Sequence, residues 1–274
     1  MDSMDKNHEL KIFRAFILFV CVLLVTPFWG RTYAAEPEEK IVRVAVAANF
    51  QSAFEQLARA FEKESAYQLE AVTGASGKLY AQIRNGAPYH LFLPADAEHA
   101  TRLEDEGLAV KGSRFTYAVG RLAVYTNAVQ SAEVVRQRLA SGDFTHLAVA
   151  KPELAPYGAA AIEMLKRLGV WEDLKEKVVY GENVTQAYQF VRGGGAELGV
   201  VAYAQVVQEK IGGVWLVPEN LHTPICQDAV LLTGAREHPG AKLFIKFLKL
   251  PAAGTIIKKS GYEAEPVVAR LPSQ

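Results

Sequence analysis

Short β-branched strands alternate with helical segments through the first half of the chain, and this alternation most limits the folds it can adopt. Residues 41–47 (IVRVAVA) are bounded by polar residues and favour a strand. Phe50, Phe54 and Leu57 then recur at helical spacing. Further strands are predicted at 67–72 and 90–93, and helices follow them at 79–83 and 97–106. This order predicts a parallel sheet covered by helices.

The same alternation restarts in the second half of the chain. The strands predicted there span 122–125, 147–150, 178–180, 198–203, 214–217 and 229–232. The helices predicted there span 158–168, 184–192 and 239–248. A chain of 274 residues is long enough for two modest domains. We therefore expect two α/β lobes, with ligand chemistry in the cleft between them.

The N-terminal segment has the order of a secretory signal peptide. Basic residues precede an apolar run that extends from about residue 15 to 29, and small residues follow at 32–35. The run is short for a membrane-spanning helix, which needs about 20 apolar residues. We therefore expect residues 1–35 to be a cleaved signal peptide and the mature chain to be periplasmic. An uncleaved N-terminal membrane anchor is the alternative.

Charge and cysteine content narrow the function further. The chain carries 30 Lys+Arg and 30 Asp+Glu, so its formal net charge is zero, which argues against a nucleic-acid-binding protein. Any anion site must therefore be built from local groups. Removal of the signal peptide leaves Cys226 without an intramolecular disulfide partner, and neither the cysteines nor the six histidines show metal-ligand spacing.

Four predicted strands run into a loop of small or hydroxyl residues and then directly into a helix. These loops span 47–50, 73–77, 155–158 and 181–184. In open α/β sheets, ligands bind at the carboxyl ends of the strands, where helix N-termini offer unpaired N–H groups and about half a positive charge each. Each loop taken alone is also explained as a helix cap. Four together supply about two positive charges, enough for a dianion, and Ser76 and Tyr157 offer hydroxyl donors.

One of these loops resembles a phosphate-binding P-loop but lacks its spacing. The sequence GASGK at 74–78 places the first glycine too close to the lysine, and Leu79 stands where Ser or Thr must bind magnesium. We therefore interpret Lys78 as a solvated lysine of the first helical turn.

Two other groups of residues suggest catalysis only weakly. Asp96, Glu98 and His99 stand together where a surface helix begins, so a charged helix cap explains them better than a catalytic cluster. Ser76 lacks the G-x-S-x-G context of a nucleophile, and no histidine stands near it in the sequence.

Seven motifs, in order along the mature chain, carry a family resemblance. They read VAVAANF at 44–50, TGASGKLYAQI at 73–83, NGAPYHLFLPAD at 85–96, PYG at 156–158, GENVTQAYQFV at 181–191, LGVVAYAQV at 198–206 and PICQDAVLL at 224–232. In these motifs the chain resembles the periplasmic molybdate-binding proteins of ABC importers. The resemblance implies the class II periplasmic-binding fold: two α/β lobes, two crossover strands as a hinge, and an oxyanion held by neutral donors in the interlobe cleft.

The resemblance also implies which residues contact the oxyanion. The family's contacts carry over to Ala48, Asn49, Ser76, the backbone at Tyr157, and Val184. Some members have a hydroxyl residue in the first loop; Ala48 and Asn49 offer none, so a main-chain N–H or the Asn49 amide must serve. Other members place a tyrosine where this chain has Ala202, and Tyr203 follows one residue later. Because such a shift in a strand turns a side chain to the opposite face, the Tyr157 hydroxyl is the alternative to Tyr203 as a ligand.

The function implied by the resemblance is that of the solute-binding component of an ABC importer. It would bind molybdate, and tungstate, holding the molybdenum of molybdate through the residues named above, and deliver the anion to a membrane permease. We expect a monomer with no cofactor, no nucleic-acid partner and no enzymatic activity. Lobe 1 is expected at 36–119 and 226–274, and lobe 2 at 120–225, with crossings near 117–122 and 223–229.

Other cargoes and other functions remain as alternatives. Sulfate, like molybdate, is fully deprotonated at neutral pH and needs only donors, whereas hydrogen phosphate also needs a carboxylate acceptor. The first three loops contain no Asp or Glu, and Glu182 in the fourth loop is the one candidate acceptor. A serine hydrolase or transferase that uses Ser76, and the effector domain of a transcription factor, are alternatives of other classes.

Overall fold

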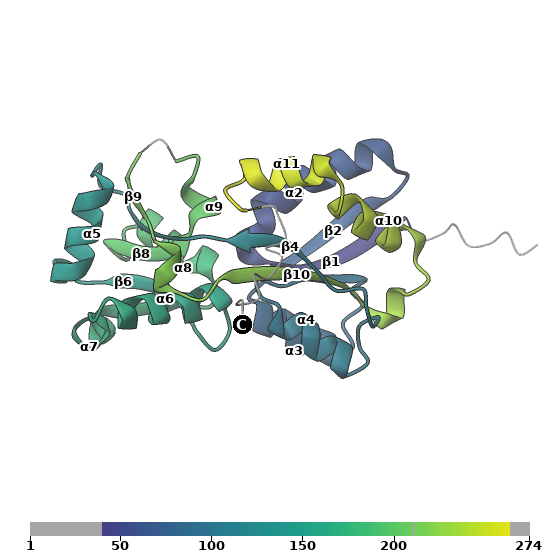
Figure 1. The fold of residues 1–274 in the computed structure, drawn as a ribbon, viewed down its shortest axis with the longest axis horizontal. Coiled ribbons are helices and arrows are strands. Elements are labelled where there is room, and N and C mark those ends of the chain that lie inside the picture. The colour runs from purple at the N-terminus through teal and green to yellow at the C-terminus, as the bar shows by residue number, and fades with distance from the viewer. Residues whose placement is uncertain (1–39, 210, 264–274) are drawn as a thin grey trace, which may run out of the picture. The chain divides into compact units, whose positions relative to one another are not determined.

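A computed structural model describes residues 40–209 and 211–263, all of which belong to one structural unit that spans residues 39–274. The predicted signal peptide, residues 1–35, lies outside the described residues. The unit contains two five-stranded sheets with helices packed on them (Figure 1). Within the described ranges, no helix combines the length and the apolar character that crossing a bilayer requires.

The first sheet has the strand order β2-β1-β3-β10-β4. Its strands are β1 (Ile41–Ala47), β2 (Gln68–Gly74), β3 (Leu91–Leu93), β4 (Phe115–Gly120) and β10 (Ile225–Leu231). Strand β1 is parallel to β2 and β3, whereas β10 is antiparallel to both of its neighbours. The helical segments of this half are η1 (Ala48–Phe50), α2 (Gln51–Glu64), α3 (Ser76–Arg84), α4 (Glu98–Asp105), η4 (Thr233–Ala235), α10 (Pro239–Leu248) and α11 (Pro251–Lys259).

The second sheet has the strand order β7-β6-β8-β5-β9. Its strands are β5 (Leu122–Thr126), β6 (Leu147–Ala150), β7 (Val178–Gly181), β8 (Leu198–Ala202) and β9 (Gly213–Leu216). The helical segments are α5 (Ala132–Ser141), α6 (Pro156–Arg167), α7 (Trp171–Leu174), η2 (Lys175–Lys177), α8 (Val184–Arg192), α9 (Tyr203–Val206) and η3 (Glu219–Leu221). Helices α6 and α8 both pack on β6 and β8. The predicted α/β architecture of two lobes is confirmed.

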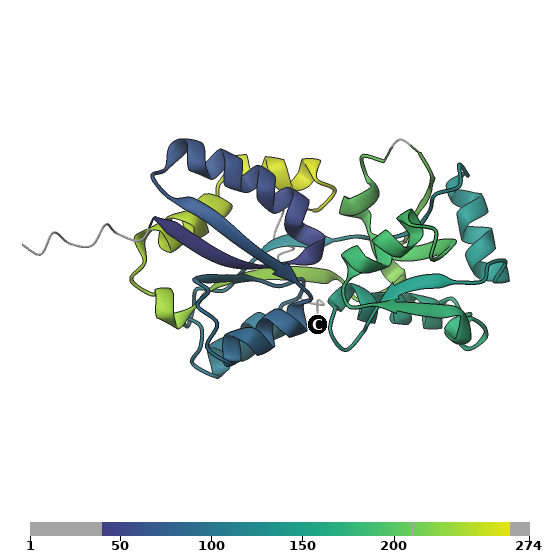
Figure 2. The same ribbon diagram turned by 180° about the vertical axis from the view of Figure 1, so that it is seen from behind.

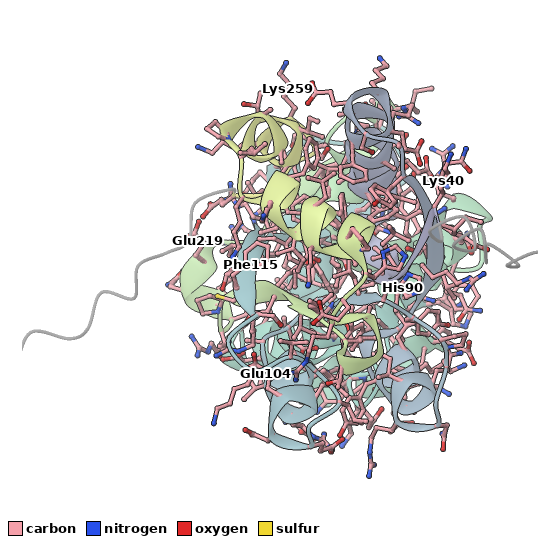
Figure 3. All side chains as sticks on the ribbon, turned by 90° about the vertical axis from the view of Figure 1, so that its right-hand side faces the viewer. Lys40, His90, Glu104, Phe115, Glu219 and Lys259 are labelled. Atoms are coloured by element: carbon pink, nitrogen blue, oxygen red, sulfur yellow. The ribbon has the colours of Figure 1, made fainter. Side chains whose placement is uncertain are left out.

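The alternation of side chains along β1 explains why the first sheet is covered on both faces. Val44 and Val46 belong to one core cluster with side chains of α2 and α10, while Ala45 belongs to another with side chains of α3 and α4. Figures 1 and 2 show these helices on opposite faces of the sheet. In the end-on view of Figure 3, charged side chains such as Lys259 extend outward, and carbon-rich side chains fill the space between the layers. The sequence of a strand that is buried on both faces is a nearly continuous apolar run.

The chain passes between the two sheets through two neighbouring segments. Only Arg121 separates the end of β4 at Gly120 from the start of β5, and the chain returns through residues 217–224 into β10. Ile225, the first residue of β10, pairs with Gly120, so the two segments lie side by side (Figure 1). The first crossing lies within the predicted 117–122, whereas the second, at 217–224, lies mostly before the predicted 223–229. The predicted lobe boundaries at 119/120 and 225/226 stay a prediction.

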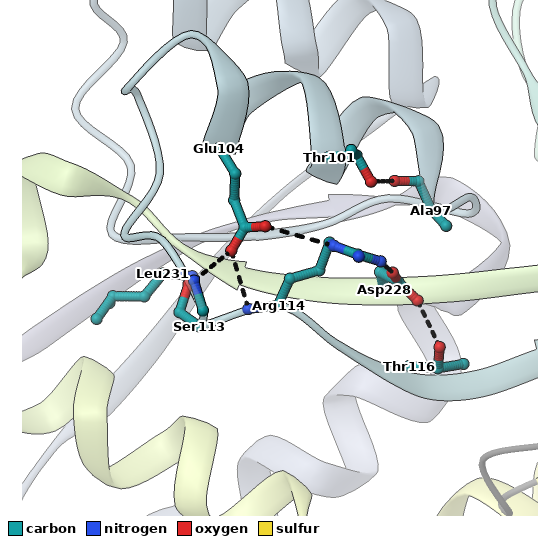
Figure 4. A network of polar contacts seen from close by, with 9 residues as sticks. Ala97, Thr101, Glu104, Ser113, Arg114, Thr116, Asp228 and Leu231 are labelled. Carbon is teal, nitrogen blue, oxygen red and sulfur yellow. Dashed lines mark hydrogen bonds and ion pairs between the residues drawn. The ribbon is translucent and has the colours of Figure 1, made fainter. Parts of the chain in front are cut away.

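Next to the crossing, β10 buries a carboxylate, shown with its partners in Figure 4. Asp228 is 1% exposed and accepts hydrogen bonds from Arg114 Nη1 at 2.5 Å and from Thr116 Oγ1 at 2.6 Å. The hydrogen bond to Asp228 raises the pKa of Arg114. The pairing of β10 with β4 shifts register between Gln227 and Asp228, and such a β-bulge re-aims neighbouring side chains.

Some element boundaries differ from those predicted. The predicted strand 198–203 is wrong at its last residue, because β8 ends at Ala202 and Tyr203 begins the short helix α9. Strand β10 begins at Ile225 and not at 229, because it pairs with β4 along its length. The predicted helix at 79–83 begins earlier, at Ser76. A separate helix, α11, follows the predicted helix at 239–248.

Candidate functional site

A small cavity lies where the four predicted loops meet. It is lined by Ala47, Ala48, Asn49, Gly74, Ala75, Ser76, Ala95, Ala155, Pro156, Tyr157, Asn183 and Val184. The cavity volume is about 10 Å³, far below the 300 Å³ or so at which pockets for drug-sized ligands begin. No Lys, Arg, Asp or Glu is among these lining residues. The cavity has room for about one water molecule, and its lining offers only neutral groups to a ligand.

Helix N-termini supply main-chain donors to this cavity. Helix α3 begins at Ser76, α6 at Pro156 and α8 at Val184, and the first N–H groups of a helix have no partner within it. The N-cap residues of α3 and α6 are alanines and make no side-chain capping bond, so no side chain of the cap competes with a ligand there. Because Pro156 has no N–H, the donor at the start of α6 is the N–H of Tyr157.

Ser76 is held in the cavity with a defined hydrogen-bond polarity. Its side chain is 1% exposed, and its Oγ accepts a hydrogen bond from the Ala95 N–H at 2.9 Å. A hydroxyl oxygen that accepts in this way keeps its own proton for a second partner. In the part of the chain that the structure describes, no histidine hydrogen-bonds to Ser76. The arrangement suits a donor to an anion rather than a nucleophile, which requires an adjacent base.

Asn49 is held from behind by buried side chains. Its Nδ2 donates to Gln227 Oε1 at 2.9 Å and to the Tyr262 hydroxyl at 3.1 Å, and Asn49 is 5% exposed. Gln227 Nε2 in turn donates to the Tyr157 hydroxyl at 3.4 Å. Burial raises the pKa of Tyr157 well above its usual range, so the hydroxyl stays protonated.

Two glycines allow the close approaches that shape the cavity. A Cβ on Gly120 would lie 2.1 Å from the Tyr157 hydroxyl oxygen, so the side chain of Tyr157 fits only because β4 ends on a glycine. A Cβ on Gly158 would lie 2.3 Å from the Ala150 carbonyl oxygen, so glycine also lets the first turn of α6 approach β6. Both distances are far inside van der Waals contact.

Contacts between the lobes surround the cavity. Gly77 N donates to Leu154 O at 3.0 Å, and Thr185 Oγ1 donates to Ala48 O at 3.1 Å. Thus the second loop meets the third, and the fourth meets the first. The four loops therefore form one site with contributions from both lobes.

The charged residues considered from the sequence lie outside the cavity lining. Lys78 Nζ pairs with Glu182 Oε1 at 2.7 Å, and both side chains are about half exposed, at 45% and 54%. The hydrogen bond from Lys78 lowers the pKa of Glu182. Lys78 is therefore half exposed, as a solvated lysine of the first helical turn would be, and it is ion-paired across the lobes. Asp96 accepts from the His99 N–H at 2.7 Å and contacts its ring, as a charged cap does.

Of the residues predicted to bind the ligand, the structure brings five together and leaves one out. Ala48, Asn49, Ser76, Tyr157 and Val184 all line the cavity. Tyr203 does not: it begins α9, and its N–H donates to Arg121 O at 2.8 Å.

The buried polar residues behind the cavity were not predicted. Gln227 is 0% exposed, and Tyr117 and Tyr262 are 5% and 4% exposed. The only signal in the sequence is that Gln227 and Asp228 interrupt the apolar run PICQDAVLL. A buried glutamine in an apolar strand requires hydrogen-bond partners, but the pattern does not identify them.

Comparisons with known proteins agree with this fold. Residues 42–263 match the model of the family described as bacterial extracellular solute-binding protein. The molybdate-binding protein ModA of Azotobacter vinelandii is 44% identical over 242 residues, which cover 87% of this chain and 96% of that protein. ModA of Rhodobacter capsulatus is 43% identical over 82% of this chain and 88% of its own length.

Solved structures show the same likeness. The periplasmic molybdate-binding protein of Azotobacter vinelandii superposes with a TM-score of 0.77 at 38% identity, covering 82% of this chain and all of that one. The sulfate-binding protein SubI of Mycobacterium tuberculosis, at 13% identity and a TM-score of 0.69, shares the fold alone. The chain is a bacterial extracellular solute-binding protein with the two-lobed class II periplasmic-binding fold. Within that class it belongs to the ModA family.

Proposed function

We propose that this chain is the solute-binding component of an ABC importer and that its cargo is molybdate, with tungstate as a second ligand. The observation that supports this most directly is the lining of the cavity, where helix N-termini and hydroxyl groups from both lobes meet without a charged side chain. Relatives at 43–44% identity are molybdate-binding proteins.

Main-chain N–H and hydroxyl donors favour anions whose oxygens all accept hydrogen bonds and carry no proton. Three helix N-termini and the 3-10 turn at Ala48 contribute up to about two positive charges in total, without a counterion in the resting protein. The carboxylate of Glu182 is held by Lys78 outside the cavity lining, so the site lacks the acceptor that hydrogen phosphate needs. The arrangement favours a fully deprotonated tetrahedral dianion.

The proposed contacts are those predicted residues that line the cavity. Both Nδ2 hydrogens of Asn49 already have acceptors, Gln227 and Tyr262, so we assign the main-chain N–H of the first loop, at Ala48 or Asn49, to the anion. Ser76 contributes its hydroxyl and N–H, and Tyr157 and Val184 contribute their N–H groups. Tyr203 stays a prediction from the family resemblance, without a place in the cavity lining.

The cellular role follows from the proposed class of protein. We infer that the protein is exported by cleavage after residue 34 or 35, acts as a monomer without enzymatic activity or a cofactor, and presents its anion-bound form to a membrane permease. Binding to loops of both lobes stabilises the closed arrangement that the permease would recognise.

Isothermal titration of the purified protein with molybdate, tungstate, sulfate and phosphate tests the proposal. We expect micromolar or tighter dissociation constants for molybdate and tungstate and much weaker binding of sulfate and phosphate. A protein that prefers sulfate over equimolar molybdate would contradict the assigned cargo, and one that binds none of the four would contradict the proposed class of ligand.

A further inference from the structure

A chain of buried hydrogen bonds runs from the first loop to the Tyr157 hydroxyl, and its polarity is fixed at one end. The main-chain carbonyl of Asn49 can only accept, and the Tyr262 hydroxyl donates to it at 2.6 Å. Because Tyr262 has a single hydroxyl proton, its oxygen must be the acceptor in its other contact, with the Asn49 side chain at 3.1 Å. Asn49 therefore presents Nδ2 and not Oδ1 to its partners.

The same logic sets the orientation of Gln227. The Asn49 Nδ2 group also lies 2.9 Å from the side-chain oxygen of Gln227, which must face it as an acceptor. The single proton of the Tyr117 hydroxyl faces both that oxygen and the Pro94 carbonyl oxygen, each at 3.2 Å. The amide nitrogen of Gln227 is thereby turned toward the Tyr157 hydroxyl, 3.4 Å away.

The Tyr157 hydroxyl is consequently left with a proton to donate. An amide N–H can only donate, so the Tyr157 oxygen accepts from Gln227. In residues 40–209 and 211–263, the structure shows no acceptor for the Tyr157 proton, although Tyr157 is 1% exposed and is one of the residues that line the cavity. A buried hydroxyl proton without a partner is costly, and a bound anion removes that cost.

We propose that Gln227 is a positioning residue that sets the specificity of the site, by holding the Tyr157 hydroxyl as a donor toward the bound oxyanion. This inference rests on the proposed function. Gln227 does not line the cavity itself. It acts through Tyr157 and Asn49, one from each half of the site. A hydroxyl that is fixed as a donor binds the acceptor oxygens of molybdate, but it cannot accept the proton of hydrogen phosphate.

No charged side chain takes part in this chain of hydrogen bonds. The neighbouring carboxylate, Asp228, is turned to Arg114 and Thr116 on the other side of the register shift. Gln227 Nε2 donates to the Tyr157 hydroxyl beside the Asn49 amide, so the atom that residue 227 presents contributes directly to the polarity of that hydroxyl. A single substitution at this position is able to reverse it.

Gln227→Glu makes that reversal. The carboxylate keeps an oxygen for Asn49 and Tyr117, but it presents a second oxygen, an acceptor, to Tyr157. The Tyr157 hydroxyl then donates to the carboxylate and turns its lone pairs toward the cavity, where they accept the proton of hydrogen phosphate. The new negative charge weakens the binding of both dianions, so the informative quantity is the ratio of the dissociation constants of phosphate and molybdate.

The matched control is the same substitution in a Tyr157→Phe background, where no hydroxyl remains to be reoriented. We expect Gln227→Glu to shift the ratio toward phosphate by about tenfold or more when Tyr157 is present, the value of one hydrogen bond to a charged group. In the Tyr157→Phe background we expect no shift of the ratio. An equal shift in both backgrounds, or no shift in either, would overturn the inference.

A second variant covers the case in which the buried carboxylate prevents folding. Gln227→Met is neutral and similar in length but lacks the donor, so it should weaken molybdate binding several-fold with Tyr157 and much less with Tyr157→Phe. If the double variant loses molybdate affinity by the product of the two single-variant losses, the inference is overturned, because independent sites are additive in free energy. Wild-type protein that binds molybdate tightly while these couplings are absent contradicts only the role of Gln227. Wild-type protein that binds none of the oxyanions contradicts the proposed function, and with it this inference.

Discussion

Replacing Ser76 by alanine changes two energies that the structure allows to be estimated separately. The Ser76 Oγ accepts from the buried Ala95 N–H at 2.9 Å, so Ser76→Ala leaves that donor unpaired, at a cost of about 1–3 kcal/mol of folding free energy. The same change removes a hydroxyl donor to the proposed anion. Hydrogen bonds to charged groups contribute about 1.5–3 kcal/mol, which corresponds to a loss of roughly ten- to a hundredfold in affinity.

A control variant distinguishes the two effects. Ser113 Oγ accepts from the Leu231 N–H at 3.1 Å, on β10 and away from the cavity (Figure 4). Ser113→Ala therefore removes the same kind of hydrogen bond without touching the site. We expect both variants to lower the melting temperature of the anion-free protein, measured by calorimetry, and only Ser76→Ala to weaken molybdate binding in a titration.

The two measurements also define what would refute the reasoning. Unchanged molybdate affinity in Ser76→Ala would mean that the hydroxyl serves only as the acceptor for Ala95. Equal losses of affinity in Ser76→Ala and Ser113→Ala would mean that loosening of the fold, and not a lost donor, weakens binding.

Four other outcomes are expected. Lys78→Ala should weaken molybdate binding by no more than about fivefold, because exposed ion pairs such as that with Glu182 contribute about 1 kcal/mol or less, and a loss of a hundredfold would make Lys78 an anion contact. Gly120→Ala should lower the free energy of unfolding by about 1–3 kcal/mol through overpacking and also weaken binding, since its Cβ would lie 2.1 Å from the Tyr157 hydroxyl oxygen; an unchanged melting curve would contradict this. Because burial raises the pKa of Tyr157 well above 10.0, its proton is lost only above that pH, and titrations should show a constant molybdate affinity from neutrality toward pH 10. A fall within that range would assign an ionisable group to the site. Saturating molybdate should reduce the radius of gyration in solution scattering by hinge closure, and identical values with and without the anion would contradict closure.

The sequence predicts the lobes and the loops better than it predicts what lies behind them. Strand β1 is predicted with its bounds because period and composition agree locally: Val44 and Val46 alternate with Ala45 on two buried faces. The loop residues follow from the same local logic, since a helix that starts directly after a parallel strand places its first N–H groups at the sheet edge.

The buried hydrogen bonds behind the cavity cannot be predicted from local sequence patterns, because they join residues that are far apart in the chain. Asn49 meets Gln227 and Tyr262 across separations of 178 and 213 residues, and no local period relates them. Tyr203 shows the converse: a one-residue shift relative to the family places it at the start of α9, where it has no position in the cavity lining.

The contacts between the lobes contribute only a small free energy to closure, so the bound anion decides the balance between the open and closed forms. Among the described residues around the cavity, the contacts between the lobes include three hydrogen bonds, from Gly77, Thr185 and Gln227, and the exposed pair of Lys78 with Glu182. Net contributions near 1 kcal/mol for each hydrogen bond and less for the ion pair are comparable to the cost of ordering the loops. A dianion that adds charge-assisted bonds to both lobes at once then stabilises the closed form more than these contacts do. Closure is thus coupled to occupancy, because the anion prefers the one form in which all four loops reach it.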